Sequence, residues 1–332
     1  MTTRRVVAIT FGDAQTGSTK FRIKQYENYL LDHGIQMETF SQKDISDRWL
    51  EEMRKADAII NQKCLLGGRW AGKILGLRKP LLFDFDDSIY TRPGKPFSFI
   101  TKIRVKHRLK RWLKTASCVT TANDYLRSYA AGYSDSVKIV PMSLDTHAWR
   151  PVERRQDRPG LVIGWAGAPS NLHHLEKIEP SLASILDQFP HVSLAVFSGQ
   201  RPKLSCRYDY VPFQEGAEAA FVQNIDIGLL PLIDEEFSKG KSPIKAIQYL
   251  ACGIPVVGNF YGATRELLNA GNSLPVTAPQ EWVPALRRLL TDSSLREQMG
   301  RQGRQDIVQG HCLKRTGEIL KDTLLQLIEE GR

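Results

Sequence analysis

The chain has 332 residues, which is too long for one ordinary hydrophobic core and suits two domains. Its 42% hydrophobic and 25% charged residues indicate a globular, soluble protein and exclude a disordered one, and its apolar runs are too short to cross a bilayer. The formal net charge of +10 suits an anionic partner, which is nucleic acid, a membrane surface or a phosphorylated substrate.

The N-terminal sequence MTTRRVVAITFGDAQ predicts a first strand rather than a signal peptide, because its apolar stretch is only VVAITF. The five cysteines are scattered and include no C-x-x-C pair. This pattern favours a reducing cytosol over a disulfide or zinc framework, so we expect a cytoplasmic protein.

The first half of the chain alternates apolar runs with helical patterns. Strands are predicted at 4–12, 56–63, 79–87, 116–123 and 137–141. Helical spacing marks 18–34 and the basic stretch 101–114. Continuous Val, Ile and Leu runs separated by helices indicate a parallel sheet covered on both faces. We assign residues 1–150 to this first domain.

After Pro141 a polar, arginine-rich stretch runs to Gly160 and is the predicted linker. Strands are then predicted at 161–167, 192–199, 208–213, 225–232 and 254–258, and helices at 170–190, 242–253, 279–292, 293–309 and 312–330. The predicted fold class is α/β, with two Rossmann-like, doubly wound domains facing a cleft. The second domain is assigned to 151–310, and the C-terminal helix at 311–332 is expected to cross back to the first.

The stretch SPIKAIQYLACGIPVVG begins at Ser242, which suits the N-cap of a helix, and Gly253 suits the residue after its end. A loop that leads into a helix N-terminus presents unpaired N–H groups and suits a phosphate. Lys245 adds a positive charge where an ordinary helix favours an acid. Gln248, one turn on, is placed to bind a ribose. The alternative is a surface helix with a solvated lysine.

The order of landmarks resembles the retaining glycosyltransferases of family 4, also called group 1 glycosyl transferases. The landmarks are VKIVP at 137–141, IGWAG at 163–167, DIGLLPL at 226–232 and a K-x-x-[EQ]-Y-x-A-x-G-x-P-V-V block at 245–257. They span almost the whole chain. The resemblance implies the GT-B architecture of two Rossmann-like domains and a nucleotide-diphosphate sugar bound mainly by the second. It implies that Lys245 holds the diphosphate and Gln248 the ribose.

Two positions depart from that family. Gln248 stands where Glu is more frequent, and Gly240 stands where an acid usually binds the donor sugar. The donor sugar therefore stays open, and Gly240 and Ser242 are kept as parts of the predicted donor-binding loop.

The stretch IGWAGAPSNLHHL carries a small-residue turn at Gly167, which allows close approach of the backbone to a phosphate. Ser170 or Asn171 is predicted to cap the following helix. His173 and His174 stand where the resemblance leads us to expect a basic residue. Either histidine, if protonated, would stabilise leaving-group charge, and His174 is taken as the catalytic candidate. The alternative is a tight turn with exposed histidines.

In the first domain, FGDAQTGSTKFR nearly fits a P-loop, but Ser18 stands where the lysine belongs, which excludes a P-loop nucleotide hydrolase. Gly17, Lys20 and Arg22 are predicted to approach the donor phosphates, with plain surface charge as the alternative.

FDFDDSIY ends a predicted strand with Asp84, Asp86 and Asp87. The D-x-D pattern suggests a metal-bound diphosphate, but helix dipoles and basic residues do that work in the two-domain architecture. We expect no metal and no cofactor besides the donor. Asp86 or Asp87 is predicted to position an acceptor hydroxyl, with Asp87 taken as the catalytic candidate, and helix capping is the alternative.

The basic helix at 101–114 places Val105, Leu109, Trp112 and Leu113 on one arc, which we expect to pack on the first domain. The opposite, basic arc is interpreted as a contact with anionic lipid headgroups or an anionic acceptor, or as a solvated surface. Nucleic acid is not expected, because the tryptophan falls on the buried arc.

These observations predict a glycosyltransferase, specifically a hexosyltransferase, that uses a nucleotide-diphosphate sugar and a polysaccharide or lipid-linked acceptor in polysaccharide biosynthesis. It would be cytoplasmic and peripheral to the inner face of the membrane. The alternatives are a nucleotide-sugar epimerase or hydrolase on the same architecture, and a non-catalytic nucleotide-binding homologue.

Overall fold

The computed structural model describes residues 3–94, 96–153 and 160–331. The chain divides into two compact units. Unit 1 comprises Met1–Ser143, Glu235–Ser242 and Leu313–Arg332, and unit 2 comprises Leu144–Asp234 and Pro243–Cys312. Residues 154–159 of the predicted linker lie outside the described residues.

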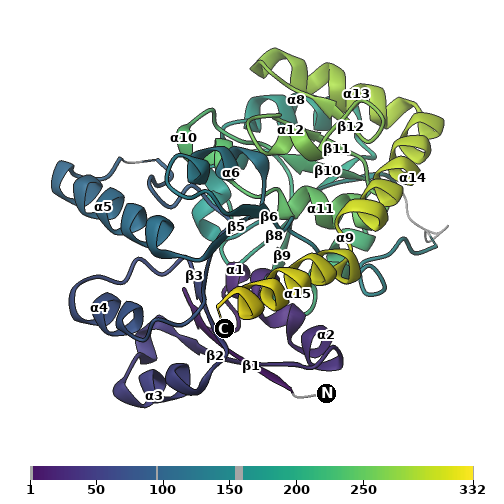
Figure 1. Ribbon diagram of the computed structural model, residues 1–332. Coiled ribbons are helices and arrows are strands. Elements are labelled where there is room, and N and C mark those ends of the chain that lie inside the picture. The colour runs from purple at the N-terminus through teal and green to yellow at the C-terminus, as the bar shows by residue number, and fades with distance from the viewer. Residues whose placement is uncertain (1–2, 95, 154–159, 332) are drawn as a thin grey trace. The chain divides into compact units, whose positions relative to one another are not determined.

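Unit 1 contains a six-stranded parallel sheet in the order β2-β1-β3-β4-β5-β6 (Figure 1). The strands are β1 (Arg4–Thr10), β2 (Ile35–Ser41), β3 (Ala58–Gln62), β4 (Leu81–Phe85), β5 (Cys118–Thr121) and β6 (Val137–Ile139). Their apolar side chains alternate between the two faces: Val7 and Ile9 belong to one buried cluster, and Val6 and Ala8 to another. Both faces are therefore covered, as the continuous apolar runs predict.

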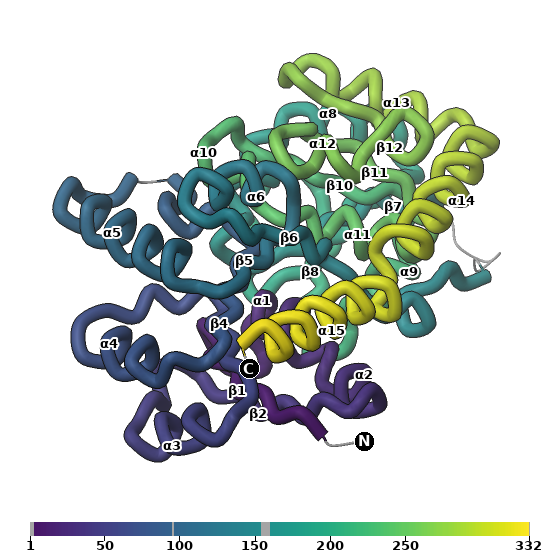
Figure 2. The backbone as a smooth tube through the Cα atoms, in the orientation of Figure 1, coloured from purple at the N-terminus to yellow at the C-terminus, as the bar shows by residue number. Residues whose placement is uncertain are grey.

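One face of this sheet is covered by four helices: α3 (Asp47–Lys55), α4 (Gly68–Gly76), α5 (Phe99–Thr115) and α6 (Asp124–Ala131). The other face is covered by α1 (Gly17–Arg22), η1 (Lys24–Tyr26), α2 (Glu27–Asp32) and the C-terminal α15 (Leu313–Glu330). In Figure 2 the yellow α15 lies beside the purple segment that carries α2. The stripe of Leu320, Leu324 and Leu327 buries α15 against β3 and β4 of this unit.

Unit 2 contains a second six-stranded parallel sheet in the order β12-β11-β10-β7-β8-β9. Its strands are β7 (Val162–Ala166), β8 (Ser193–Ser198), β9 (Asp209–Pro212), β10 (Ile227–Leu230), β11 (Val256–Gly258) and β12 (Ser273–Pro275). Its helices are α7 (Leu172–Glu176), α8 (Glu179–Gln188), α9 (Glu218–Gln223), α11 (Ile244–Ala251), α12 (Thr264–Leu267), α13 (Trp282–Thr291) and α14 (Ser293–Gly310), together with η3 (Pro169–Asn171) and η4 (Pro279–Glu281). Two parallel sheets with covering helices make this an α/β fold of two Rossmann-like domains.

Two predicted helices are interrupted. The helix expected at 18–34 is divided into α1, η1 and α2, and the one expected at 170–190 into η3, α7 and α8. Pro180 lies in the first turn of α8, where its missing N–H costs nothing, and this marks the second break.

The grouping of segments differs from the predicted domains in two places. Residues 144–150 group with unit 2 rather than with the first domain. Glu235–Ser242, which includes the helix α10 (Glu236–Gly240), groups with unit 1, although the strands before and after it in the chain belong to unit 2. In the described parts of the chain, no helix is both long enough and apolar enough to span a membrane.

Candidate active-site residues

A cluster of charged side chains lies at the carboxyl ends of β3 and β4, which pair in parallel. Lys63 follows β3, and its Nζ lies 2.8 Å from Asp86 Oδ1 and 2.9 Å from Asp87 Oδ2, both just after β4. Nζ also donates to Ser18 Oγ at 2.5 Å, and Ser18 Oγ donates to Asp86 Oδ2 at 2.7 Å. We call Ser18, Lys63, Asp86 and Asp87 the Lys63 cluster. Lys63 was not among the predicted site residues, although a lysine directly after a buried strand is a usable signal.

The charges of the Lys63 cluster shift one another's pKa values. Burial alone would lower the pKa of the Lys63 ammonium, but Asp86 and Asp87 outweigh burial and hold that pKa above its ordinary value. Burial opposes ionisation of Asp86, yet Lys63 holds its pKa below the usual range. The pKa of Asp87 is raised, first by burial and then by the nearby charge of Asp86. Asp87 keeps 24% of its side chain exposed, so it is the carboxylate of the cluster best able to meet a hydroxyl.

The backbone of Lys63 is strained. Its φ is +46°, and Lys63 and Arg78 are the two non-glycine residues with positive φ in the described ranges. Its amide donates to the carbonyl of Asp84 at 2.7 Å. Such conformations persist where the surroundings dictate them, and they occur often at functional sites.

Arg22 has a different role from the one predicted. Its buried guanidinium forms a two-pronged ion pair with Asp84, with Nε 3.1 Å from Oδ2, and also donates to the carbonyl of Val140. Thr120 Oγ1 completes the network by donating to Asp84 Oδ1 at 2.7 Å. All of these groups are buried, so Arg22 supports the core of unit 1 rather than a ligand. Gly17 begins α1, is exposed and has open space where a side chain would point, and its predicted role stays a prediction.

The segment Glu235–Ser242 is tied to unit 1 by hydrogen bonds. Ser242 Oγ donates to the carbonyl of Asp86 at 2.6 Å, and Asn123 Nδ2 donates to the carbonyl of Gly240 at 3.3 Å. A Cβ on Gly240 would lie 2.0 Å from Ser88 Oγ. Gly240 and Ser242 therefore take part in packing and chain anchoring in unit 1, and their assignment to the donor-binding loop stays a prediction. An acidic side chain has no room at 240.

The N-terminus of α11 in unit 2 also differs in detail from the prediction. Pro243, not Ser242, occupies the cap position, and no side chain of the described residues caps this helix. Lys245 is the second helical residue and is half-buried. Uncapped first-turn amides and a lysine give this end of α11 a positive character. The helix ends as predicted, since Gly253 has φ +72° directly after its C-cap.

Gln248, one turn into α11, is 1% exposed, and within the described structure its Oε1 has no hydrogen-bond partner. Leaving a buried acceptor unpaired costs about 1–3 kcal/mol, so such an atom calls for a ligand donor. Ser198 Oγ, at the end of β8, and His173 Nε2 are likewise buried without a partner in the described part of the chain. A polar ligand at the start of α11 would supply the donor that Gln248 Oε1 lacks.

The turn after β7 carries the remaining predicted residues. Gly167 N donates to the carbonyl of Phe197 at 3.1 Å, so this turn lies beside the end of β8. A Cβ on Gly167 would lie 2.4 Å from the Trp165 ring, which gives the glycine a packing reason of its own. Ser170 and Asn171 lie within η3, and Asn171 occupies the N-cap position of α7 as predicted, but its side chain makes no capping hydrogen bond within the described structure.

His174 is not an exposed histidine. Its ring is buried on α7 and lies 4.1 Å from the ring of His173. The catalytic role given to His174 and the phosphate-binding roles given to the turn stay predictions.

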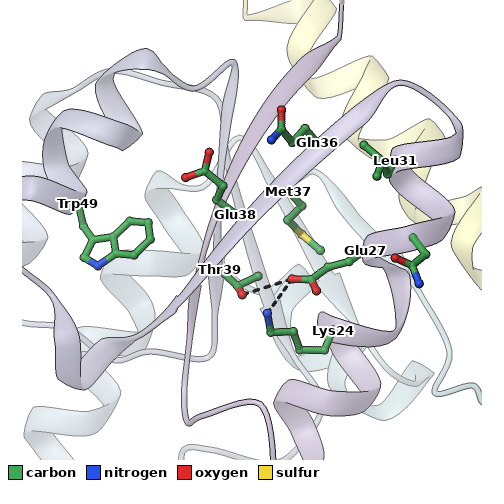
Figure 3. Close-up of a pocket in the computed structure, with 9 residues that line it drawn as sticks. Lys24, Glu27, Leu31, Gln36, Met37, Glu38, Thr39 and Trp49 are labelled. Atoms are coloured by element: carbon green, nitrogen blue, oxygen red, sulfur yellow. Dashed lines mark hydrogen bonds and ion pairs between the residues drawn. The ribbon is translucent and has the colours of Figure 1, made fainter.

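A pocket of about 400 Å³ lies elsewhere, along the edge strand β2 and helix α2 (Figure 3). Its charged groups satisfy one another: Lys24 Nζ lies 2.9 Å from Glu27 Oε1, and Thr39 Oγ1 donates to the same oxygen at 3.3 Å. None of the predicted site residues lines it. Among the described residues, no group of three or more His, Cys, Asp or Glu side chains is arranged to hold a metal ion.

Comparison with known proteins gives three kinds of match. A family model described as "Glycosyl transferase-like" matches residues 186–321. The D-inositol 3-phosphate glycosyltransferase of Corynebacterium jeikeium (strain K411) is 26% identical over 227 residues, which cover 59% of this chain and 52% of that protein. The chain thus spans about half the length of this curated relative.

Two solved structures resemble almost the whole chain. The sucrose-phosphate synthase from Thermosynechococcus elongatus is 16% identical with a TM-score of 0.74, covering 98% of this chain and 100% of that one. Anabaena HepE, in complex with UDP and glucose, is 17% identical with a TM-score of 0.75, covering 97% of this chain and 100% of that one. At this identity the likeness shows the fold, which is the GT-B arrangement of two Rossmann-like domains.

Proposed function

We propose that this protein transfers a hexose from a nucleotide-diphosphate sugar to a hydroxyl of a polysaccharide or lipid-linked acceptor, with retention at the anomeric carbon. The single observation that carries the donor half of the proposal is the start of α11. There Lys245 lies in an uncapped first turn, and Gln248 holds a buried oxygen for which the described structure supplies no donor. A UDP complex of a protein with the same fold supports a nucleotide ligand.

In the proposed complex, Lys245 and the first-turn amides of α11 bind the donor diphosphate, and Gln248 Oε1 accepts a hydrogen bond from a ribose hydroxyl. Gly167, with Ser170 and Asn171, lies in the turn that would approach the phosphates. Negative charge grows on the diphosphate as the glycosidic bond breaks, so a fixed cation and oriented amides stabilise the transition state more than the ground state. The proposal needs no metal ion for this neutralisation.

On the acceptor side, Asp87 would hydrogen-bond the attacking hydroxyl and orient it. Its raised pKa makes it a better proton acceptor than an ordinary aspartate. Lys63 holds Asp87 in place through its ion pair. A phosphate oxygen of the donor is a second acceptor for that proton, and His174 is proposed to stabilise the leaving group.

The experiment is a thermal-shift screen with UDP, GDP and ADP and their hexose conjugates, followed by turnover of the donor that binds. A ligand that binds only the native state raises the melting temperature. Lys245→Ala should abolish the shift and lower turnover by about 100- to 1000-fold. Lys177→Ala, an exposed lysine of the same unit, is the matched control and should behave as the unaltered protein.

Two results would contradict the proposal. One is the absence of any shift with every nucleotide, and the other is full turnover in Lys245→Ala. Release or epimerisation of the sugar from donor alone would instead support the hydrolase or epimerase alternative. Nucleotide binding without turnover over a broad acceptor panel would support a non-catalytic homologue. We further propose that the protein works at the cytoplasmic face of the membrane.

A further inference from the structure

Helix α5 presents an unusual outer face. Phe99, Ile100 and Ile103 are 78%, 77% and 53% exposed, so three large apolar side chains stand in solvent within five residues. They make up three of the eight large apolar residues that are so exposed among the described residues. We call these three residues the apolar tip. Clusters of this kind mark interaction surfaces, whereas single exposed apolar residues need no explanation.

The opposite side of α5 is firmly fixed in unit 1. Leu109, Trp112 and Leu113 are fully buried in the core that contains β4 and β5. Trp112 Nε1 donates to the carbonyl of Leu66 at 3.0 Å, and Arg108 Nη1 donates to that of Leu65 at 3.2 Å. The apolar tip therefore lies at the N-terminal end of a helix whose C-terminal half is fixed in the core.

The charged side chains of the sequence stretch that contains the tip have one sign. Between Asp87 and Asp124 the sequence contains nine Lys and Arg residues and no Asp or Glu. At about 100° per residue, one arc of about 80° on α5 contains Phe99, Ile103, Lys106, Lys110 and Lys114. Lys106, Lys110 and Lys114, which are all exposed, continue the line of the tip for about 12 Å along the helix. We call them the basic stripe.

We propose that the outer face of α5 docks on an anionic phospholipid bilayer, with the apolar tip inserted among the acyl chains and the basic stripe on the headgroups. At a bilayer surface the acyl chains lie directly below the anionic headgroups, so the apolar tip and the basic stripe can both be bound at once. A nucleic acid would satisfy the cations but leave Ile100 and Ile103 against hydrated phosphates, since aliphatic side chains do not stack on bases. The proposal concerns a surface of unit 1 and is independent of any transfer reaction.

The test is co-sedimentation of the full chain with vesicles of phosphatidylcholine alone and of phosphatidylcholine with an equal amount of phosphatidylglycerol. The unaltered protein should bind the anionic vesicles and not the neutral ones. Phe99→Ala/Ile100→Ala/Ile103→Ala should weaken this binding by at least about tenfold, because insertion scales with buried apolar area. Alanine keeps the helix propensity of these exposed positions.

A matched control removes three exposed apolar residues elsewhere, Leu31→Ala/Val152→Ala/Val308→Ala, and should leave vesicle binding unchanged. Lys106→Gln/Lys110→Gln/Lys114→Gln should also weaken binding and reduce its sensitivity to salt, whereas Lys43→Gln/Lys177→Gln/Lys314→Gln, with the same loss of charge, should not.

Equal vesicle binding by the tip variant and its control would overturn the proposal. So would retention on an RNA or DNA oligonucleotide together with indifference to anionic vesicles. Because the assay measures no turnover, a failure of vesicle binding leaves the proposed glycosyl transfer intact, and a failure of transfer leaves this surface intact.

Discussion

The ammonium of Lys63 lies 2.9 Å from the carboxylate of Asp87, at the ends of two neighbouring parallel strands. The same nitrogen pairs with Asp86 and bonds to Ser18, so one buried cation holds three acceptors in place. Residues from the ends of β3 and β4 and from α1 thus converge on a single atom, and the stability of unit 1 depends on its charge.

Lys63→Met should destabilise the protein by about 3–5 kcal/mol at neutral pH, because it leaves the buried Asp86 and the partly buried Asp87 without their cation. Chemical denaturation followed by circular dichroism measures this loss. The loss should shrink as pH falls, since protonated Asp86 and Asp87 no longer need the ammonium. Lys73→Met is the control, because its partner Asp47 is 71% exposed and such surface pairs contribute only about 0–1 kcal/mol. Equal effects of the two substitutions would contradict the role of Lys63.

The pH dependence of turnover should report Asp87. The raised pKa of its carboxyl means that it loses its charge at a higher pH than an ordinary aspartate as the solution is acidified. We expect kcat to fall as pH drops through that pKa, and Asp87→Asn to lower kcat and abolish this acid limb. Lys63→Met, where folded, should move the limb to higher pH, since it removes a charge that favours ionised Asp87. An unchanged acid limb in Asp87→Asn would exclude Asp87 as the group that titrates. The control Asp32→Asn, at an exposed position, should change neither kcat nor its pH dependence.

Gly240→Ala should destabilise the protein by about 1–3 kcal/mol, the usual cost of overpacking. The new Cβ would meet Ser88 Oγ at 2.0 Å and Leu126 Cδ2 at 2.9 Å. Gly17→Ala, with open space around the added carbon, is the matched control and should be neutral or slightly stabilising. Thermal unfolding distinguishes the two. An unperturbed Gly240→Ala protein would show that the segment Glu235–Ser242 is not held against unit 1.

Gln248→Leu should separate ligand binding from stability. It removes a buried oxygen that has no donor in the described structure, so the ligand-free protein should be as stable as the original or more stable. Affinity for the nucleoside diphosphate should fall about 5- to 10-fold, as expected for one lost hydrogen bond. Calorimetric titration and thermal unfolding measure the two effects. A loss of stability with unchanged affinity would make Gln248 a core residue only.

The features that the sequence predicts correctly are encoded by residues that lie close together in the chain. The apolar runs that form β1, β3, β4, β7 and β8 are visible as such, and the buried arc of α5 follows from helical spacing, with Leu109, Trp112 and Leu113 all fully buried. The position at which α11 ends is predicted from one residue, Gly253, because glycine readily adopts the positive φ found there. These features depend on residues a few positions apart.

The errors concern partners that are distant in sequence. Arg22 looked like a phosphate ligand because nothing nearby shows that Asp84, 62 residues away, occupies its guanidinium. For Gly240 and Ser242 the sequence likewise does not show the contacts with Ser88 and Asp86, which lie more than a hundred positions earlier in the chain. Lys63 was overlooked although it directly follows a buried strand, because its partners Asp86 and Asp87 lie 23 and 24 positions later in the chain.

By itself the sequence determined the alternation of strands and helices, the presence of two parallel sheets and the position of the α11 block, since each is encoded by the spacing of apolar residues and turn residues along the chain. Only the tertiary structure decided which charges are paired, which polar atoms are left unsatisfied and which apolar side chains remain in solvent. Those outcomes depend on burial and on contacts between distant segments, because the same lysine or phenylalanine can lie in a core, at a site or on a surface with no change in its local sequence.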